Sequence, residues 1–102
     1  VRIDGRMASD AELISWFEAV ELARDSKALT FFEFTTAAAL LGFHRSDIEV
    51  GVLEVGLGGR LDAVNAIDPD VAIVTSVDLD HQNWLGATRD RIGYEKAGIF
   101  RP

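Results

Sequence analysis

Apolar residues recur at helical spacing in two stretches of the first half of the chain. The apolar positions of the first stretch, residues 10–25, are Leu13, Trp16, Phe17, Val20 and Ala23. The second stretch runs from residue 30 to about Gly42 and is apolar on most of its surface. A capping box, in which a hydroxyl and a glutamate satisfy amides at a helix start, precedes each stretch, at Ser9–Glu12 and Thr30–Glu33. The pattern predicts two helices, the second of them buried.

Two apolar runs in the second half of the chain predict β-strands. Residues 48–55 are rich in branched side chains. Residues 71–75 are almost continuously apolar, as expected for a central strand that is covered on both faces. The link between them, residues 56–70, is long enough for a parallel crossover, which needs about a dozen residues.

Shorter elements are predicted at the two ends of the chain. Residues 1–7 contain the turn signal Asp4-Gly5 and predict a short edge strand or hairpin. Thr88 is a capping residue for a last helix, whose buried side carries Ile92, Ala97 and Ile99. The order helix, helix, strand, strand, helix predicts part of an α/β layered sheet, with all of residues 1–102 in one domain.

Composition narrows the class of protein. A length of 102 residues fits one small domain, and a net charge of −7 argues against a nucleic-acid partner or an anionic membrane surface. The absence of cysteine excludes disulfides and thiolate sites and fits a reducing cytoplasm. No apolar run approaches the roughly 20 residues that span a bilayer. Because the chain starts at Val1 and stops just after an apolar helix, we expect a fragment of a larger protein.

Polar side chains follow both predicted strands at the point where each strand ends. Residues 54–65 follow the first strand, and residues 76–84 follow the second. Ligands of open parallel α/β sheets bind beyond the carboxyl ends of the strands, so we expect these two segments to be neighbours and to form a site.

The first segment combines a carboxylate with a glycine run. Glu54 lies among apolar neighbours, and a buried carboxylate needs a partner, which is either a metal or a cation such as Arg60. The alternative is an edge-strand glutamate that faces water or pairs with Arg60. The glycine run, residues 56–59, permits close backbone approach but lacks the spacing of a phosphate-binding loop, and a plain tight turn also explains it.

Three further features carry candidate chemistry. His81 follows two aspartates, and a carboxylate nearby can orient an imidazole that binds a metal; the alternative is a solvated loop histidine. Lys96 by itself predicts only an exposed helical lysine. Phe31 and Phe32 offer an apolar surface for a flat ligand, although aromatic residues at a helix start usually belong to the core.

Together these motifs resemble one family, the bifunctional dihydrofolate synthase/folylpolyglutamate synthases of the Mur ligase superfamily. The resemblance runs from about Leu29 to Arg101. The motifs that carry it are Leu29-Thr30-Phe31-Phe32-Glu33, Leu53 through Asn65, Thr75-Ser76 with Leu79-Asp80-His81, Trp84-Leu85-Gly86, and Ile92-Gly93 with Glu95-Lys96-Ala97-Gly98-Ile99-Phe100. Several motifs in the right order and spacing make the match specific.

The resemblance implies an ATP-dependent amide ligase with Mg²⁺ as its metal. In this family ATP phosphorylates a carboxylate of dihydropteroate or of the glutamyl tail of a reduced folate, and the amino group of L-glutamate attacks the acyl phosphate. Carried over by motif, Glu54 and His81 are the magnesium ligands, and Lys96 is carbamylated. The pterin-binding residues implied in the same way are Thr30, Phe31, Phe32, Glu33, Leu61, Asp62 and Ala63.

The implied fold is part of a three-layer sheet with mainly parallel strands and flanking helices, from the P-loop ATPase domain of a Mur-type ligase. The family's ATP-binding loop lies upstream of these motifs and its carboxyl-terminal domain lies downstream, so we expect the 102 residues to be inactive alone and to contain no ATP-contacting loop. The parent is expected to be a monomer, whereas the piece is expected to self-associate through exposed apolar surface.

The sequence departs from the family pattern at two positions, and two alternative functions remain open. Val64 replaces a threonine, and Asp78 adds a negative charge close to His81. One alternative is a ligase that adds amino acids to a cell-wall precursor, against which the pterin-type segments argue. The other is a non-catalytic binding module with a nucleotide-type fold, which an intact short gene ending at Pro102 would favour.

Overall fold

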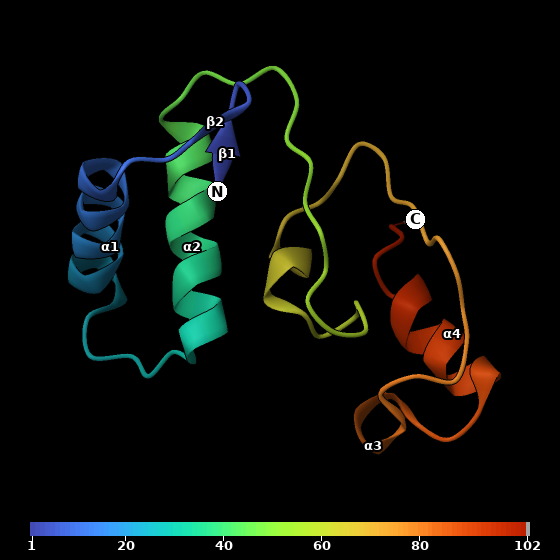
Figure 1. The fold of residues 1–102 in the computed structure, drawn as a ribbon. Coiled ribbons are helices and arrows are strands. Elements are labelled where there is room, and N and C mark those ends of the chain that lie inside the picture. The colour runs from blue at the N-terminus through green and yellow to red at the C-terminus, as the bar shows by residue number, and fades with distance from the viewer. Residues whose placement is uncertain (102) are drawn as a thin grey trace. The chain divides into compact units, whose positions relative to one another are not determined.

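A computed structural model describes residues 1–101 (Figure 1). The contacts of the chain divide it into two compact units, Val1–Val52 and a second unit that begins at Leu53. Each unit is described by itself. The prediction that the whole chain lies in one domain stays a prediction.

The first unit opens with a small antiparallel hairpin. Strand β1 (Arg2–Ile3) pairs with β2 (Arg6–Met7), and Ile3 lies opposite Arg6. Asp4 and Gly5 form the turn with φ angles of 50° and 75°, which is the left-handed geometry of the tight turns that hairpins favour. The hairpin predicted over residues 1–7 is confirmed.

Two capped helices follow the hairpin, α1 (Asp10–Arg24) and α2 (Phe31–His44). In each, the hydroxyl before the helix accepts from the third helical amide, and the glutamate at that position accepts from the backbone amide of the capping residue. Both predicted capping boxes are confirmed. The second helix ends at His44, slightly beyond the predicted end near Gly42.

The core of the first unit lies where α1 and α2 pack together. Its buried side chains are Ile3, Trp16, Val20 and Ala38. Gly42 lies directly against Trp16, because a Cβ at this position would lie 2.7 Å from the indole ring. The rings of Phe17 and Phe34 stack beside this core with centroids 5.8 Å apart.

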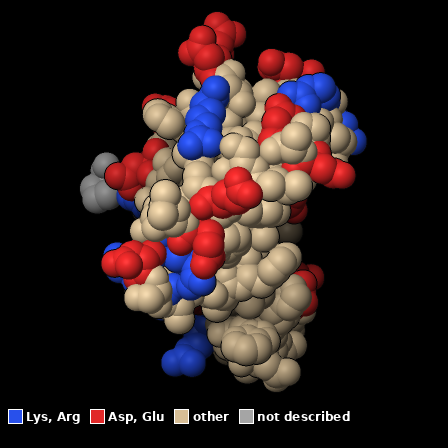
Figure 2. All heavy atoms as spheres, turned by 90° about the vertical axis from the view of Figure 1, so that its left-hand side faces the viewer, with Lys and Arg blue, Asp and Glu red and all other residues tan. Residues whose placement is uncertain are grey.

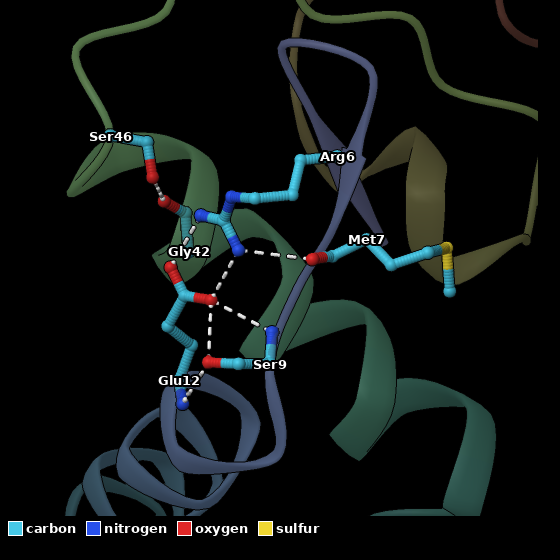
Figure 3. Close-up of polar contacts among 6 residues, drawn as sticks. All are labelled: Arg6, Met7, Ser9, Glu12, Gly42 and Ser46. Carbon is cyan, nitrogen blue, oxygen red and sulfur yellow. Dashed lines mark hydrogen bonds and ion pairs between the residues drawn. The ribbon is translucent and has the colours of Figure 1, made fainter.

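A polar cluster ties the hairpin to the start of α1 (Figure 3). The Arg6 guanidinium donates to both carboxylate oxygens of Glu12 at 2.8 Å and to the Met7 carbonyl at 3.0 Å. The same carboxylate accepts from the backbone amide and the hydroxyl of Ser9, both at 2.8 Å. Glu12 therefore holds the helix cap and the hairpin at once.

The second unit contains a short 3₁₀ helix and two α-helices. These are η1 (Ala63–Ala66), α3 (Gln82–Leu85) and α4 (Arg89–Ala97). Thr88 caps α4 through the Arg91 amide, and Ile92 is fully buried, so the last predicted helix is confirmed. Ala97, which was expected on the buried side, is exposed.

The two predicted strands, 48–55 and 71–75, are not strands in this structure. The β1–β2 hairpin is the sheet that residues 1–101 form. Alternate apolar side chains of the two segments are 72 to 87% exposed, namely Val50, Val52, Val71 and Ile73. A strand exists only when a neighbour satisfies its backbone groups, and no described segment pairs with either run. The three-layer sheet therefore stays a prediction.

The surface of the chain is rich in acidic groups. On the face drawn in Figure 2, acidic side chains are scattered among uncharged ones, and basic side chains lie between them. This mixture is in keeping with the net charge of −7. Among residues 1–101 there is no helix with the length and apolar character needed to cross a membrane.

Gly42 offers a test of the first core. An alanine in a helix normally stabilises it by about 1 kcal/mol relative to glycine. Because its Cβ would clash with the ring of Trp16, we expect Gly42→Ala instead to destabilise the chain by about 1–3 kcal/mol in urea denaturation followed by circular dichroism. Gly51→Ala is the matched control, because its Cβ meets only Ile48 at an ordinary 3.5 Å. A Gly42→Ala chain as stable as the Gly51→Ala control would contradict this packing.

Glu12 predicts a pH dependence of stability. Hydrogen bonds from Arg6 and Ser9 hold the pKa of the Glu12 carboxyl well below its ordinary value of 4.5. A lowered folded-state pKa adds stability above pH 4.5 that is lost as the pH falls toward the folded value. We therefore expect Glu12→Gln to lower Tm most at neutral pH and progressively less in acid, as measured by scanning calorimetry. Glu18→Gln, on the exposed side of α1, is the control, and equal pH profiles for the two variants would refute the assignment.

Candidate active site

The glycine run after Glu54 is a turn that the Asp62 carboxylate holds together. Asp62 Oδ2 accepts from the amides of Gly56 and Leu57 at 3.1 and 2.9 Å, and Oδ1 accepts from the Val64 amide at 2.9 Å, where it caps η1. Gly58 adopts a left-handed φ of 70°, which favours glycine. The carboxylate that the family resemblance assigns to pterin binding thus also fixes the backbone of this turn.

Arg60 joins the turn to helix α4. Its amide donates to the Glu95 carbonyl at 2.9 Å, and its guanidinium donates through Nε and Nη2 to the Glu95 carboxylate at 3.1 and 3.0 Å. The guanidinium also lies over the Tyr94 ring, 5.7 Å from its centroid. Glu95 raises the pKa of Arg60. The cation that was a candidate partner for Glu54 is therefore paired with Glu95.

The backbone of the turn lies in direct contact with the carboxyl end of α4. A Cβ on Gly59 would lie 3.0 Å from the carbonyl oxygens of both Glu95 and Lys96, and one on Gly98 would clash with the Arg60 side chain. The Asn65 side chain donates across the contact through Nδ2, to the carbonyls of Arg60 at 3.2 Å and Gly98 at 3.1 Å. The glycines are thus needed for close approach between the turn and the helix that carries Lys96.

His81 adopts a strained backbone at the start of α3. Its φ and ψ are 48° and 38°, in the left-handed region that few residues with a bulky side chain occupy. Its amide donates to Asp80 Oδ1 at 2.7 Å, and its Nε2 lies 3.6 Å from Asp80 Oδ2. Asp4, Asp25, Ser26 and Asp47 occupy the same region, so the backbone of His81 marks a turn that the sequence did not predict.

The Asp78 carboxylate forms an ion pair with Arg89. The Arg89 guanidinium lies 2.8 Å from Asp78 Oδ1 and, with the Leu79 amide, holds the pKa of that carboxyl below its ordinary value. Asp78 was expected to add a negative charge close to His81. In the structure that charge is paired with the first residue of α4.

Glu54 lies just before the turn, and Lys96 lies on the helix that the turn contacts. Glu54 is exposed on an extended segment, which matches the alternative of a glutamate that faces water. The reason is that no described strand covers this segment. Lys96 is half-buried on the last turn of α4. Within residues 1–101, no three metal-binding side chains of His, Asp or Glu gather at one place.

The predicted pterin segment of the first unit forms the cap of α2. Glu33 accepts from the Thr30 amide at 2.7 Å and from its hydroxyl at 2.8 Å, which lowers the pKa of Glu33. Phe31 and Phe32 are 86% and 42% exposed, so neither is a core residue. In the second unit Leu61 is 80% exposed, whereas Ala63 is half-buried.

An open hollow of about 710 Å³ lies along α3 and α4 of the second unit. Its lining includes Trp84, Arg91, Tyr94 and Glu95. Glu95, which lines this hollow, pairs with Arg60, and the sequence did not predict that contact. Two opposite charges that lie 35 residues apart form no local sequence pattern from which a contact could be predicted. The one sequence feature that pointed to this helix turn was that Glu95 is next to Lys96.

The family model and the curated relatives that match this chain agree on one family. The Mur ligase middle domain matches residues 7–102. The dihydrofolate synthase/folylpolyglutamate synthase of Escherichia coli (strain K12) is 50% identical over 101 residues, which are 99% of this chain and 24% of that protein. The Haemophilus influenzae protein of the same name is 54% identical over 76 residues, covering 74% of this chain and 17% of that protein.

Two solved structures have the same fold over nearly the whole chain. E. coli FolC in complex with DHPP and ADP matches with a TM-score of 0.96 and 50% identity, over 98% of this chain and 24% of that one. The bifunctional folylpolyglutamate synthase/dihydrofolate synthase of Yersinia pestis, complexed with AMPPNP and Mn ion, matches with a TM-score of 0.92 and 52% identity over the same shares.

These matches confirm the α/β class and the resemblance drawn from the motifs. The chain spans about a quarter of the length of the curated relatives it matches. The family match covers both units, including the turn after Glu54, His81 and the helix of Lys96. The chain belongs to the Mur ligase middle domain family.

Proposed function

We propose that this chain is part of an ATP-dependent ligase that joins L-glutamate to dihydropteroate and to the glutamyl tail of reduced folates through an acyl phosphate. The observation that carries the proposal is the contact between the turn after Glu54 and the last turn of α4, where Gly59 meets the Lys96 carbonyl. Relatives named for both synthase activities, and a neighbour solved with DHPP and ADP, support the same reaction.

We assign residues 1–102 to the amino-terminal ATP-binding domain of the longer protein. In that domain the exposed extended runs, 48–55 and 71–75, are strands of a mainly parallel, three-layer sheet whose other strands lie elsewhere in the protein. Their exposed valines and isoleucine support this, because such side chains are normally covered. No Gly-x-x-x-x-Gly-Lys-Ser/Thr loop occurs among the 102 residues, so the chain alone is expected to be inactive.

Glu54 fits a magnesium site by the chemistry of its donor, and His81 is added to it by its place in the family motif. Magnesium in phosphoryl-transfer sites is usually bound by one or two carboxylates, with water and substrate phosphate oxygens completing its shell. The exposed Glu54 carboxylate supplies such an oxygen, and the exposed His81 imidazole is proposed as the second ligand. When bound, the metal would supply positive charge at the phosphoryl group being transferred.

Lys96 and the pterin segments have distinct roles in this proposal. A carbamate on Lys96 replaces an ammonium, which would repel a nearby cation, with a carboxylate-like group. Each pterin segment exposes apolar surface that suits a flat ring, Phe31 and Phe32 in the first unit and Leu61 in the second. Glu33 and Asp62 shape the backbone of these segments through their bonds to amides.

The alternatives are less well supported. A cell-wall amino-acid ligase of the same superfamily, or a non-catalytic module, does not account for relatives named for folate synthesis at 42 to 54% identity. We also propose that the longer protein is a cytoplasmic monomer whose partners include neither nucleic acid nor a membrane. The isolated chain is expected to self-associate through the exposed valines of residues 48–55.

The role of Glu54 is tested in the longer protein that we propose contains this chain. Glu54→Gln keeps the shape of the side chain and removes its charge, so we expect ADP formation to fall by about 10²–10³-fold. A coupled ADP assay with dihydropteroate and glutamate measures this. Glu49→Gln, another exposed glutamate close by in sequence, is the control and should leave turnover unchanged. Near-normal turnover by Glu54→Gln would show that Glu54 is not part of the active site.

The carbamate on Lys96 is tested by chemical rescue. Lys96→Ala should lose activity, and short carboxylates such as formate or acetate should restore part of it, because they replace the carbamate group. Lys27→Ala, which removes the only other lysine of the chain, should neither lose activity nor respond to the acids. A folded but unrescued Lys96→Ala protein would argue against a carbamate.

A further inference from the structure

We propose that the Arg60–Glu95 pair is a positioning unit, which fixes the segment carrying Glu54 at one place on the helix carrying Lys96. The inference rests on the proposed function, because that function makes the relative placement of Glu54 and Lys96 matter for catalysis. Neither Arg60 nor Glu95 is assigned a contact with the substrate. Both act through the residues next to them.

The pair joins its two segments through main chain and side chain at once. The Arg60 amide binds the Glu95 carbonyl at 2.9 Å, and two guanidinium nitrogens bind the two carboxylate oxygens at 3.1 and 3.0 Å. A two-pronged contact of this kind allows only one orientation of arginine against carboxylate, unlike a single charge–charge contact. It therefore fixes both the distance and the angle between the turn and α4.

Two glycines set how closely the segments approach. A side chain on Gly59 would meet the Glu95 and Lys96 carbonyls at 3.0 Å, and one on Gly98 would clash with Arg60. With both positions bare, backbone lies against backbone, which is a stiffer contact than one made through long side chains. The side-chain Nδ2 of Asn65 adds hydrogen bonds to the Arg60 and Gly98 carbonyls.

The path from this contact to the two site residues is short. Lys96 directly follows Glu95 on the last turn of α4. On the other side, Asp62 holds the amides of Gly56 and Leu57, so few free torsions separate Glu54 from a fixed backbone. A change at Arg60 is therefore transmitted to Glu54.

The exposure of the pair separates a positioning role from a purely stabilising one. The Arg60 and Glu95 side chains are 41% and 22% exposed. Exposed ion pairs contribute little to folding stability, whereas a displacement of about 1 Å at reacting groups costs roughly 10²-fold in rate. Loss of the pair should therefore reduce kcat far more than it reduces stability.

The experiment compares two arginine variants in the longer protein. We expect Arg60→Ala to lower kcat by about 10–100-fold and to change KM for ATP by less than about threefold. Arg60→Lys, which keeps the charge but not the two-pronged contact, should remain well below the wild type. Arg24→Ala is the matched control, because Arg24 makes the same two-pronged contact with Glu21, at 2.6 and 2.7 Å, within α1. Wild-type kcat in Arg60→Ala, or an equal loss in Arg24→Ala, would overturn the proposal.

Amide hydrogen exchange gives a readout that does not depend on the ligase assignment. Arg60→Ala should speed exchange at residues 56–60 relative to Arg24→Ala, and unchanged exchange there would overturn the positioning role alone. Normal turnover by Glu54→Gln and Lys96→Ala would instead overturn the proposed function. If Arg60→Ala does not fold, Glu95→Gln keeps the backbone bond and side-chain volume while weakening the pair. The Glu95→Gln variant should then show a loss of kcat and faster amide exchange at residues 56–60, and wild-type values for either would overturn the positioning role.

Discussion

The second unit depends on the contact between a glycine turn and the last turn of α4. Without side chains at Gly59 and Gly98, the two backbones come close enough for the Arg60 amide to reach the Glu95 carbonyl. Any Cβ at either glycine would push the turn away and break that bond. The long loop between residues 56 and 81 has little regular structure, so this contact, more than secondary structure, holds the turn that follows Glu54 against the helix of Lys96.

Carboxylates perform one structural task throughout the chain. Glu12, Glu33 and Asp62 each accept hydrogen bonds from backbone amides, at two α-helix starts and at the glycine turn. A charged acceptor makes a stronger bond to an amide than a neutral one, and at a helix start it also meets the positive end of the helix dipole. The Glu54 carboxylate takes part in none of the hydrogen bonds or ion pairs that the structure gives for residues 1–101.

The exposed extended runs connect the fold to the proposed function. Glu54 lies near the carboxyl end of the run 48–55, whereas His81 lies in the loop that follows the run 71–75. Strand pairing elsewhere in the protein would fix these runs and with them the two donors. In the proposed function, the placement of the two donors thus depends on a sheet that the described residues do not form.

The sequence alone determined the local elements and the family. The hairpin, both capping boxes and the three main helices were predictable because their signals lie within a few residues of one another. Ordered motifs were enough to identify the ligase family. Tertiary structure decided what depends on distant partners: the exposure of Glu54, the left-handed backbone of His81, and the pairing of Arg60 with Glu95 across 35 residues. Such contacts follow from how backbones meet in space, and no periodicity or spacing in the sequence encodes them.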